Sequence, residues 1–171
     1  MKYIIGLIIG IILLACQPSS NIKIKERGKY ITTVSTGKNI IEVENSLLEY
    51  TIDFLKEAEE YGYEIDKVAE NFIGIYTDVL PSDKLGLTIF RDSSSEKNYS
   101  IITKSILDLE AVKRMCVYHE LAHVFIKREH CHRKCNEIMS EYHDTHNYYN
   151  DFNEQKMILF KQLDHDFSVY L

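Results

Sequence analysis

The sequence predicts one small α+β domain, in which a mixed sheet of about three to four strands backs a single long helix. Three observations predict this fold. An amphipathic helical segment comes first, three short segments rich in β-branched and aromatic residues follow it, and a long apolar segment without glycine or proline comes next. The chain has 171 residues, 45% of them hydrophobic and 27% charged, which is typical of a globular domain with a moderate core.

The first helix is predicted over residues 45–62. Asn45 and Ser46 are typical of a helix start, apolar residues then recur at helical spacing, and Gly62 ends the pattern. The strand segments share β-branched and aromatic residues bounded by turn formers, and they cover residues 70–80, 85–90 and 99–107. We therefore expect the sheet to be complete before the long helix begins.

The long helix is predicted over residues 109–127. Asp108 is the expected N-cap, and Glu110 lies in the first turn, where negative charge suits the helix dipole. Apolar residues occur on most sides, which predicts a helix buried over most of its surface. The helix also carries two histidines and a glutamate. These groups need partners, because unpaired buried polar groups are costly, and a metal ion would supply them.

The two histidines and the glutamate form the sequence His119-Glu120-Leu121-Ala122-His123. Residues four apart lie one helical turn apart on the same face, so both imidazoles can reach one ion. The glutamate beside the first histidine can then reach a water molecule at that ion. In this pattern two histidines bind zinc and the glutamate serves as general base.

A third ligand is expected in the segment that follows the helix. His130, seven residues beyond His123, is the best candidate, and His132 is the alternative. Three protein ligands with an open fourth position are typical of a catalytic zinc site, whereas structural sites are usually closed by four. We therefore expect one Zn²⁺ ion, bound by His119, His123 and His130.

The cysteines have separate predicted roles. Cys131 and Cys135 are four residues apart and are expected to form a disulfide if the loop permits it. Cys116 lies in the long helix and is expected to be a small buried apolar residue. It is a less favoured zinc ligand, because three histidines fit better. The tail over residues 148–171 is predicted to contain a C-terminal helix.

Residues 1–15 are predicted to be a signal peptide. A positively charged start precedes an apolar run over residues 3–14, which is too short to span a bilayer comfortably. The run ends in LLAC, which resembles the bacterial lipobox and implies cleavage before Cys16 and acylation of that cysteine. The protein would then be lipid-anchored to a membrane of the bacterial cell envelope, outside the cytoplasm. An ordinary secretory signal and a buried apolar helix are the alternatives.

Residues 16–43 are predicted to be the lipidated cysteine and a tether, and residues 44–171 the folded domain. Pro18, the serines and the alternating charges of this stretch are typical of a linker, with a short edge strand expected at most over residues 30–34. The net charge of −6 and the dispersed basic residues give a nucleic-acid partner no electrostatic support.

The motifs of the long helix resemble those of the zincin metallopeptidases, in particular the metzincin-like branch. His119, Glu120 and His123 match the first part of the metzincin signature. Met139, in the sequence EIMSEY, resembles the methionine that the family places in a tight turn beneath the metal. The resemblance implies a zincin-like fold and a zinc peptidase.

The segment after His123 departs from the metzincin pattern. Ile126 stands where the family has a glycine, and His130 comes one residue later than the usual third histidine. The His-Cys pair is similar in part to archaemetzincins, but the further cysteine pair that would hold a second zinc is missing. Small bacterial lipoproteins of the metallopeptidase type, with HELGH, Arg-x-His and SIMxxY, are similar to residues 44–171. Here Arg128 precedes His130, and Tyr142 ends the last motif.

The resemblance implies a membrane-anchored peptidase with a peptide or protein substrate. Glu120 would take a proton from the attacking water and pass it to the leaving amine. Tyr142 would hydrogen-bond the developing oxyanion, or simply pack in the core. Met139 would support the site by packing, and Arg128 would hold the loop that carries His130, or lie on the surface.

Two further functions stay open. One is a non-catalytic lipoprotein that keeps the metal as a clip or uses His130, His132 and His143 to bind it for transport. The other is an inactive interaction module that retains the fold. The presence of Glu120 disfavours both, because a glutamate at this position is not needed as a ligand.

Overall fold

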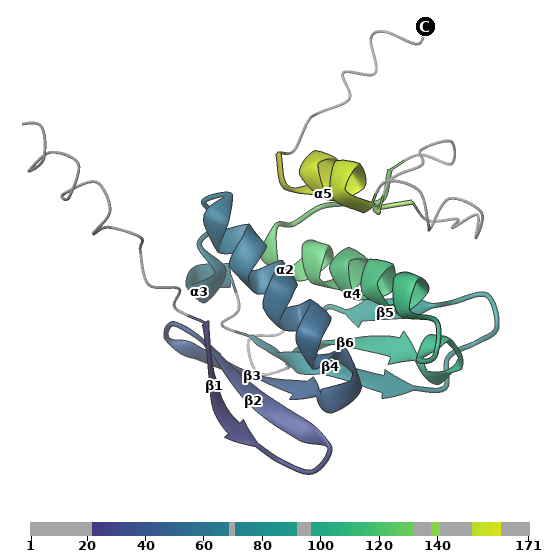
Figure 1. Ribbon diagram of the computed structural model, residues 1–171, viewed down its shortest axis with the longest axis horizontal. Helices are drawn as coiled ribbons and strands as arrows, with labels where there is room; N and C mark the ends of the chain where they lie inside the picture. Colours follow the sequence, from purple (N-terminus) through teal and green to yellow (C-terminus); the bar gives the residue numbers. More distant parts are fainter. Residues whose placement is uncertain (1–21, 69–70, 92–96, 132–137, 141–151, 162–171) are drawn as a thin grey trace, which may run out of the picture.

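A six-stranded sheet and the helices that cover it make up the described part of the chain (Figure 1). The computed structural model describes residues 22–68, 71–91, 97–131, 138–140 and 152–161. The strands are β1 (Ile22–Arg27), β2 (Ile31–Thr36), β3 (Asn39–Glu44), β4 (Phe72–Asp78), β5 (Gly86–Ile89) and β6 (Asn98–Thr103). The helices are the short 3-10 turns η1 (Asn45–Leu47) and η2 (Lys104–Ile106) and the α-helices α2 (Leu48–Glu60), α3 (Ile65–Val68), α4 (Glu110–Phe125) and α5 (Phe152–Lys161).

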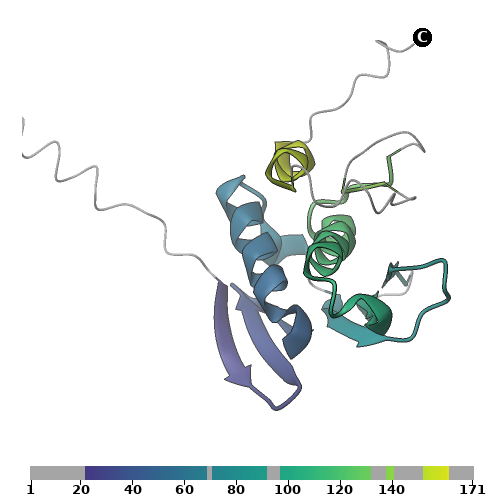
Figure 2. The ribbon, with the colours of Figure 1, turned by 45° about the vertical axis from the view of Figure 1, so that its right-hand side comes forward.

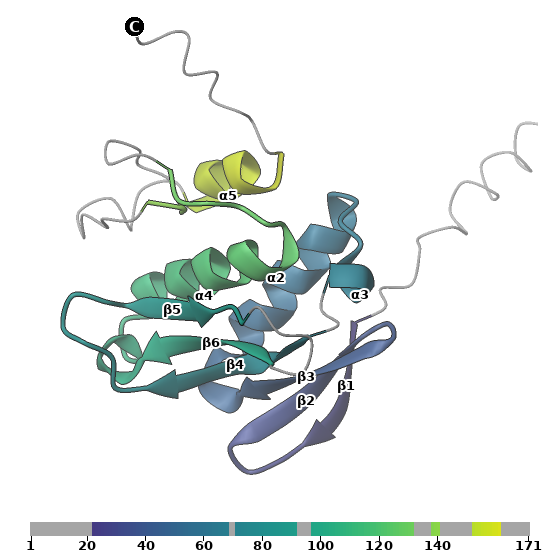
Figure 3. The ribbon, with the colours of Figure 1, turned by 180° about the vertical axis from the view of Figure 1, so that it is seen from behind.

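The sheet is mixed and has the strand order β1-β2-β3-β4-β6-β5 (Figure 3). β3 with β4 and β4 with β6 are parallel pairs, and the other neighbours are antiparallel. Parallel neighbours need a crossover connection, which α2 and α3 provide between β3 and β4. β5 lies at the edge of the sheet, beyond β6, and it is this edge that contacts α4.

The helices lie on one face of the sheet, with α2 and α4 side by side (Figure 2). α4 packs against β5 and β6, so the helix that carries the histidine motif is held by the β5 edge of the sheet. The predicted α+β class, with a mixed sheet behind a long helix, is confirmed. Within the described ranges, no helix combines the length and the hydrophobicity that crossing a membrane requires.

The predicted number of strands was wrong, because the sheet has six strands and not three to four. β1 and most of β3 were missed, and at the position of β2 only a short edge strand over residues 30–34 was expected. Strands therefore occupy much of the stretch that was predicted to be a tether. Val34, Ile41 and Val43 are fully buried, whereas β1 is largely exposed at the edge. An exposed, charged edge strand has the composition of a linker, and this similarity misled the prediction.

The predicted start of the long helix was also wrong in detail. Leu109, not Asp108, is the N-cap of α4, and no side chain caps this end. The turn η2 leads directly into the helix, and Leu109 N donates to Ile106 O at 2.9 Å. The preceding turn therefore joins the helix through the backbone, without a capping side chain. The end of α2 follows the prediction more closely, since Gly62 has a left-handed φ of 88° and terminates the helix.

Aromatic side chains join α2, α4 and α5 into one core. The ring of Phe54 lies 5.3 Å from that of Tyr118, 6.2 Å from that of Phe125 and 5.3 Å from that of Phe160. All four side chains are buried. Most residues of α4 are buried as well, including Cys116, which is a free thiol as expected. The helix thus has little freedom to shift relative to the sheet.

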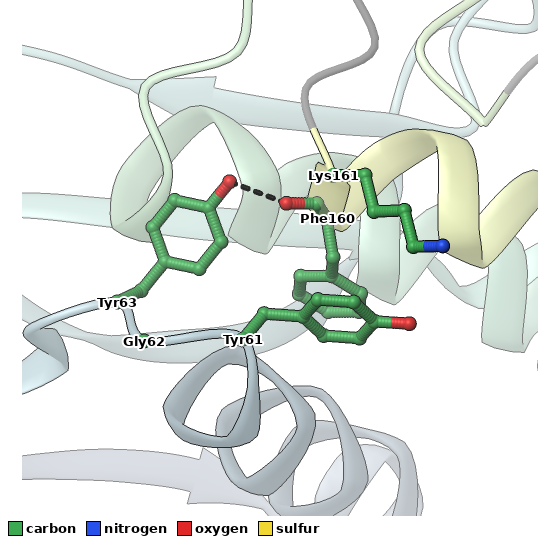
Figure 4. A pocket seen from close by; sticks show the side chains of 5 residues that line it. All are labelled: Tyr61, Gly62, Tyr63, Phe160 and Lys161. Carbon is green, nitrogen blue, oxygen red and sulfur yellow. Dashed lines mark hydrogen bonds between the residues drawn. The ribbon is translucent and has the colours of Figure 1, made fainter.

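Polar contacts also fix α5, the predicted C-terminal helix. Glu57 accepts hydrogen bonds from Tyr118 Oη at 3.0 Å and from Lys156 Nζ at 2.5 Å. The rings of Tyr61 and Phe160 are stacked 5.1 Å apart. Figure 4 shows the surface pocket at this corner, which contains no histidine and is lined by Tyr61, Gly62, Tyr63, Phe160 and Lys161.

Candidate metal centre

Three histidine side chains converge at the end of α4. The Nε2 atoms of His119 and His130 lie 3.0 Å apart, and the Nε2 atom of His123 lies 3.1 Å from each of them. His119 is buried, His123 is half-buried and His130 is exposed. His119 and His123 share a face because they are four residues apart in a helix. The structure therefore brings together the three residues that the sequence predicted as ligands.

A backbone reversal brings His130 back to the helix. Ile126 N and Arg128 N both donate to Ala122 O, each at 3.2 Å, and Lys127 between them has a left-handed φ of 53°. This geometry is typical of a helix C-terminus, although glycine is the usual residue in the left-handed position. We call residues 126–131 the return segment.

The return segment can be compared with the metzincin pattern that the sequence resembles in part. The left-handed residue, Lys127, comes one position after the place of the family glycine, and His130 likewise comes one position late. The turn and the ligand are therefore displaced together, and the distance between them along the chain is kept. Because the turn and His130 are shifted by the same one residue, the imidazole of His130 still reaches those of His119 and His123.

Backbone carbonyls orient two of the imidazoles. His119 Nδ1 donates to Ile138 O and His123 Nδ1 donates to Arg128 O, each at 2.7 Å. A carbonyl oxygen can only accept, so each Nδ1 carries the proton and each Nε2 presents a lone pair. Two lone pairs at 3.1 Å cannot form a hydrogen bond with each other. A cation between them would satisfy both, as it does in sites where a carbonyl fixes the histidine tautomer.

The donor set fits a zinc ion. Tetrahedral zinc with Zn–N bonds of about 2.0–2.1 Å separates its nitrogens by roughly 3.3–3.4 Å, close to the separations of 3.0–3.1 Å found here. Burial lowers the pKa of His123, which favours the neutral form that binds metal. In the part of the chain that the structure describes, this is the only cluster of three or more metal-ligating side chains.

Glu120 directly follows His119 in α4 and is itself only 5% exposed. Its Oε2 atom accepts a hydrogen bond from Thr88 Oγ1 at 2.6 Å. Burial raises the pKa of Glu120 to about 7, while the hydrogen bond from Thr88 and the charge of Lys84 act in the opposite direction. A carboxyl group with a pKa near neutrality can both take up and release a proton, which suits acid–base catalysis.

A short segment later in the chain, residues 138–140, contacts His119 and Cys131. Ile138 and Met139 are buried, and the Ile138 carbonyl is the partner of His119. Met139 O accepts a hydrogen bond from Cys131 N at 3.0 Å, and Cys131 forms a parallel bridge with Ser140. Met139 is therefore buried next to the residue that orients His119, and its predicted supporting role stays a prediction.

Other predicted residues lie outside the described ranges: Cys16, His132, Cys135, Tyr142 and His143. Cys131 is disulfide-bonded, but its predicted partner Cys135 is among these residues, so that pairing stays a prediction. Arg128 contributes through its backbone, since its carbonyl oxygen accepts the hydrogen bond from His123.

Three residues of the site were not predicted, namely Gly86, Thr88 and Ser100. Gly86 and Thr88 belong to β5 and contact Glu120, and Ser100 of β6 contacts Thr88. The alternation of β5 places Gly86 and Thr88 on one face, a signal that the sequence does contain. Which helix this face meets depends on the packing of the sheet, which the local pattern does not show.

Comparison with known protein families, with characterised proteins and with solved structures finds no match to this chain. The assignment of a function consequently depends on the geometry of the site. Three imidazole nitrogens that face one point, and a buried carboxyl group on the residue that follows the first histidine, are the features to be explained.

Proposed function

We propose that this chain is a zinc-dependent peptidase with a zincin-like fold. The observation that carries the proposal is the convergence of three Nε2 atoms, 3.0–3.1 Å apart. It is joined by Glu120, which directly follows one of these histidines in α4 and is 5% exposed. His119, His123 and His130 would be the zinc ligands, and Glu120 the general base. The Nδ1 hydrogen bonds of two of these histidines support the ligand assignment, because they leave each Nε2 free of a proton.

A zinc ion held by these residues would polarise the scissile carbonyl group and lower the pKa of a water molecule toward about 7. Glu120 would accept the proton of the attacking water and deliver it to the leaving amine. The raised pKa of Glu120 favours the first of these transfers, because it makes the carboxylate a stronger base. His123 is half-buried and His130 is exposed, so water and a peptide can reach this side of the ligands.

The metzincin-like assignment has further support in the arrangement of the chain. The third ligand follows a left-handed turn, and Met139 lies buried beside the carbonyl that orients His119. Tyr142 would be the oxyanion donor of this arrangement. The substrate would be a peptide or a protein.

We place the enzyme in the bacterial cell envelope, anchored through a lipid on Cys16 after removal of residues 1–15. The sequence LLAC before the cleavage site supports this location. β1, the first strand among the described residues, begins at Ile22.

The competing functions are a non-catalytic metal-binding lipoprotein and an inactive module with the same fold. Glu120 favours hydrolysis over both. A buried carboxyl group is costly to maintain, and this one belongs to no ligand set among the described residues. A buried glutamate directly after a proposed ligand has a simple purpose only if it handles a proton.

The decisive experiment compares the wild-type protein with Glu120→Gln. Both are purified without residues 1–15, loaded with zinc, assayed for metal content and incubated with a peptide library read by mass spectrometry. We expect one zinc per chain in both proteins, and cleavage that falls by about 10²- to 10⁴-fold in the variant. Glu60→Gln, an exposed residue at the end of α2, is the control with the same change of charge.

Each alternative has its own result. Cleavage by Glu120→Gln at the wild-type rate would show that the mechanism is wrong. Zinc binding without cleavage of any peptide by the wild type would favour the metal-binding function. A wild-type protein that folds but takes up no zinc would remove the site itself.

A further inference from the structure

We propose that Thr88 and Ser100 are positioning residues that hold the Glu120 carboxyl group in place, and that Gly86 is required to leave room for it. Thr88 would act directly on Glu120, and Ser100 would act through Thr88. The inference rests on the proposed function for its catalytic consequence, although the interaction itself can be tested without catalysis.

The pairing of β5 with β6 brings the two hydroxyl groups together. Thr88 is opposite Ser100 in this antiparallel pair, and their oxygens lie 2.8 Å apart. Thr88 Oγ1 lies 2.6 Å from Glu120 Oε2 and 3.2 Å from the backbone oxygen of Glu120. The sheet thus provides a hydroxyl contact for a side chain that belongs to the helix.

The direction of these hydrogen bonds follows from the number of protons. Thr88 has one hydroxyl proton, and the carboxyl oxygen at 2.6 Å is its nearest acceptor. When Thr88 donates to Glu120, Ser100 donates to Thr88. Ser100 is fully buried, so its hydroxyl group has no access to water. The order Ser100 to Thr88 to Glu120 satisfies all three groups, and it fixes the rotamer of Thr88.

Gly86 makes room for the other carboxyl oxygen. It lies two residues before Thr88 in β5 and therefore on the same face of the sheet. A Cβ atom at this position would come closer to Glu120 Oε1 than the 3.0 Å that real Cβ atoms respect. One carboxyl oxygen is therefore held by Thr88, while the other lies over Gly86. Both constraints come from β5, and together they restrict the carboxyl group to one place.

The catalytic test uses two matched variants of Thr88. Thr88→Val keeps the shape but removes the hydroxyl group, and Thr88→Ser keeps the hydroxyl group but removes a methyl group. We expect kcat to fall by about 10- to 100-fold in Thr88→Val, the scale of effect that a small misplacement of a reacting group produces. KM and zinc content should stay near wild type, and Thr88→Ser should recover most of kcat. Equal losses in the two variants would indicate packing alone and overturn the proposal.

Ser100→Ala extends this test along the hydrogen-bond chain. The substitution removes the donor to Thr88 but touches no atom of Glu120. We expect a loss of kcat smaller than that in Thr88→Val, and no further loss when the two substitutions are combined. If the two losses of kcat multiplied in the double variant, Ser100 would not act through Thr88, and the proposed chain of hydrogen bonds would be contradicted.

A double-mutant cycle tests the interaction apart from the proposed function. Urea unfolding midpoints are measured for the wild type, Thr88→Val, Glu120→Ala and the double variant, all free of metal. We expect Thr88→Val to lower the midpoint clearly when Glu120 is present and much less in the Glu120→Ala background. Equal shifts in the two backgrounds would overturn the proposal. If the wild type cleaves no peptide while the cycle shows coupling, the proposed function fails and the hydrogen-bond chain stands.

Discussion

α4 and the return segment contribute to one site, but they are built in different ways. α4 positions His119 and His123 by helical geometry alone, and it is buried against the sheet and α2. The return segment positions His130 through a left-handed residue and a few backbone hydrogen bonds, and it is largely exposed. The comparison teaches that two of the three proposed ligands belong to the core, whereas the position of the third depends on local backbone conformation. Each prediction below alters one of these regions or the strand β5, against which α4 packs.

Removal of a ligand should have the largest effect. His119→Ala and His130→Ala should both lower zinc affinity by more than about 100-fold, because changes next to a ligand already cost about 10- to 100-fold. The metal-free proteins should differ. His119→Ala leaves the buried Ile138 carbonyl without this donor and should lower the free energy of unfolding by about 1–3 kcal/mol.

Zinc titration and urea unfolding of the metal-free variants check this difference between core and exposed ligands. His130→Ala should unfold near the wild-type midpoint, because His130 is exposed. Similar destabilisation by both substitutions would mean that the return segment contributes to the core as much as α4 does.

The next largest effect should follow Gly86→Ala, which tests the contact between α4 and β5. A methyl group there displaces the Glu120 carboxyl group and should lower kcat by about 100-fold. Zinc content should not change, since the substitution touches none of the three histidines. Leu87→Val, on the opposite face of the same strand, is the control for changes in β5 itself. Loss of zinc in Gly86→Ala would show that the strand supports the ligands as well.

Two substitutions of Lys127 test the return segment, and we expect them to change the stability of the fold in opposite directions. Lys127→Val places a β-branched residue in the left-handed region and should lower the free energy of unfolding by about 1–2 kcal/mol. Lys127→Gly removes the strain and should change stability by less than about 1 kcal/mol, in the stabilising direction. Thermal unfolding measures both effects. Zinc affinity should fall with Lys127→Val alone, and an unchanged affinity would mean that the turn does not position His130.

The smallest effect concerns Cys116, inside α4. Burial raises the pKa of this thiol from 9.0 to about 12, with a smaller contribution from Glu120. Since the folded state disfavours the thiolate, the contribution of the thiol to stability is complete below pH 9 and is lost as the pH rises above it. Between pH 8 and pH 10 the wild type should lose about 1 kcal/mol relative to Cys116→Ala. Urea unfolding at the two pH values checks this, and parallel behaviour of both proteins would indicate an accessible thiol.

The sequence was sufficient to predict the parts of the fold whose signal is local. α2, β4, β5, β6 and α4 follow from periodicity and turn residues, and the spacing of His119 and His123 places both on one face. His130 was predicted as the third ligand, but the turn that brings it back to α4 was not predicted. The left-handed conformation of Lys127 had no signal, because lysine rarely adopts it.

Parts of the structure that depend on contacts far apart in the sequence were not predictable. β1 looks like a linker because its charged residues face solvent at the edge of the sheet. The contact of Thr88 with Glu120 joins residues 32 positions apart. It exists only because β5 lies at the edge of the sheet under α4. Strand register and helix packing decide such contacts, and neither can be read from a single segment.

The early start of β1 has a consequence for where the proposed enzyme can work. With the first strand at Ile22, a lipid on Cys16 would leave only residues 17–21 between the bilayer and the domain, a reach of about 20 Å at full extension. Substrates held at the same membrane would then meet the site at a high effective concentration. A soluble peptide would gain no such advantage. Under this anchoring, selection among substrates would depend on their distance from the bilayer as well as on the amino acids around the cleaved bond.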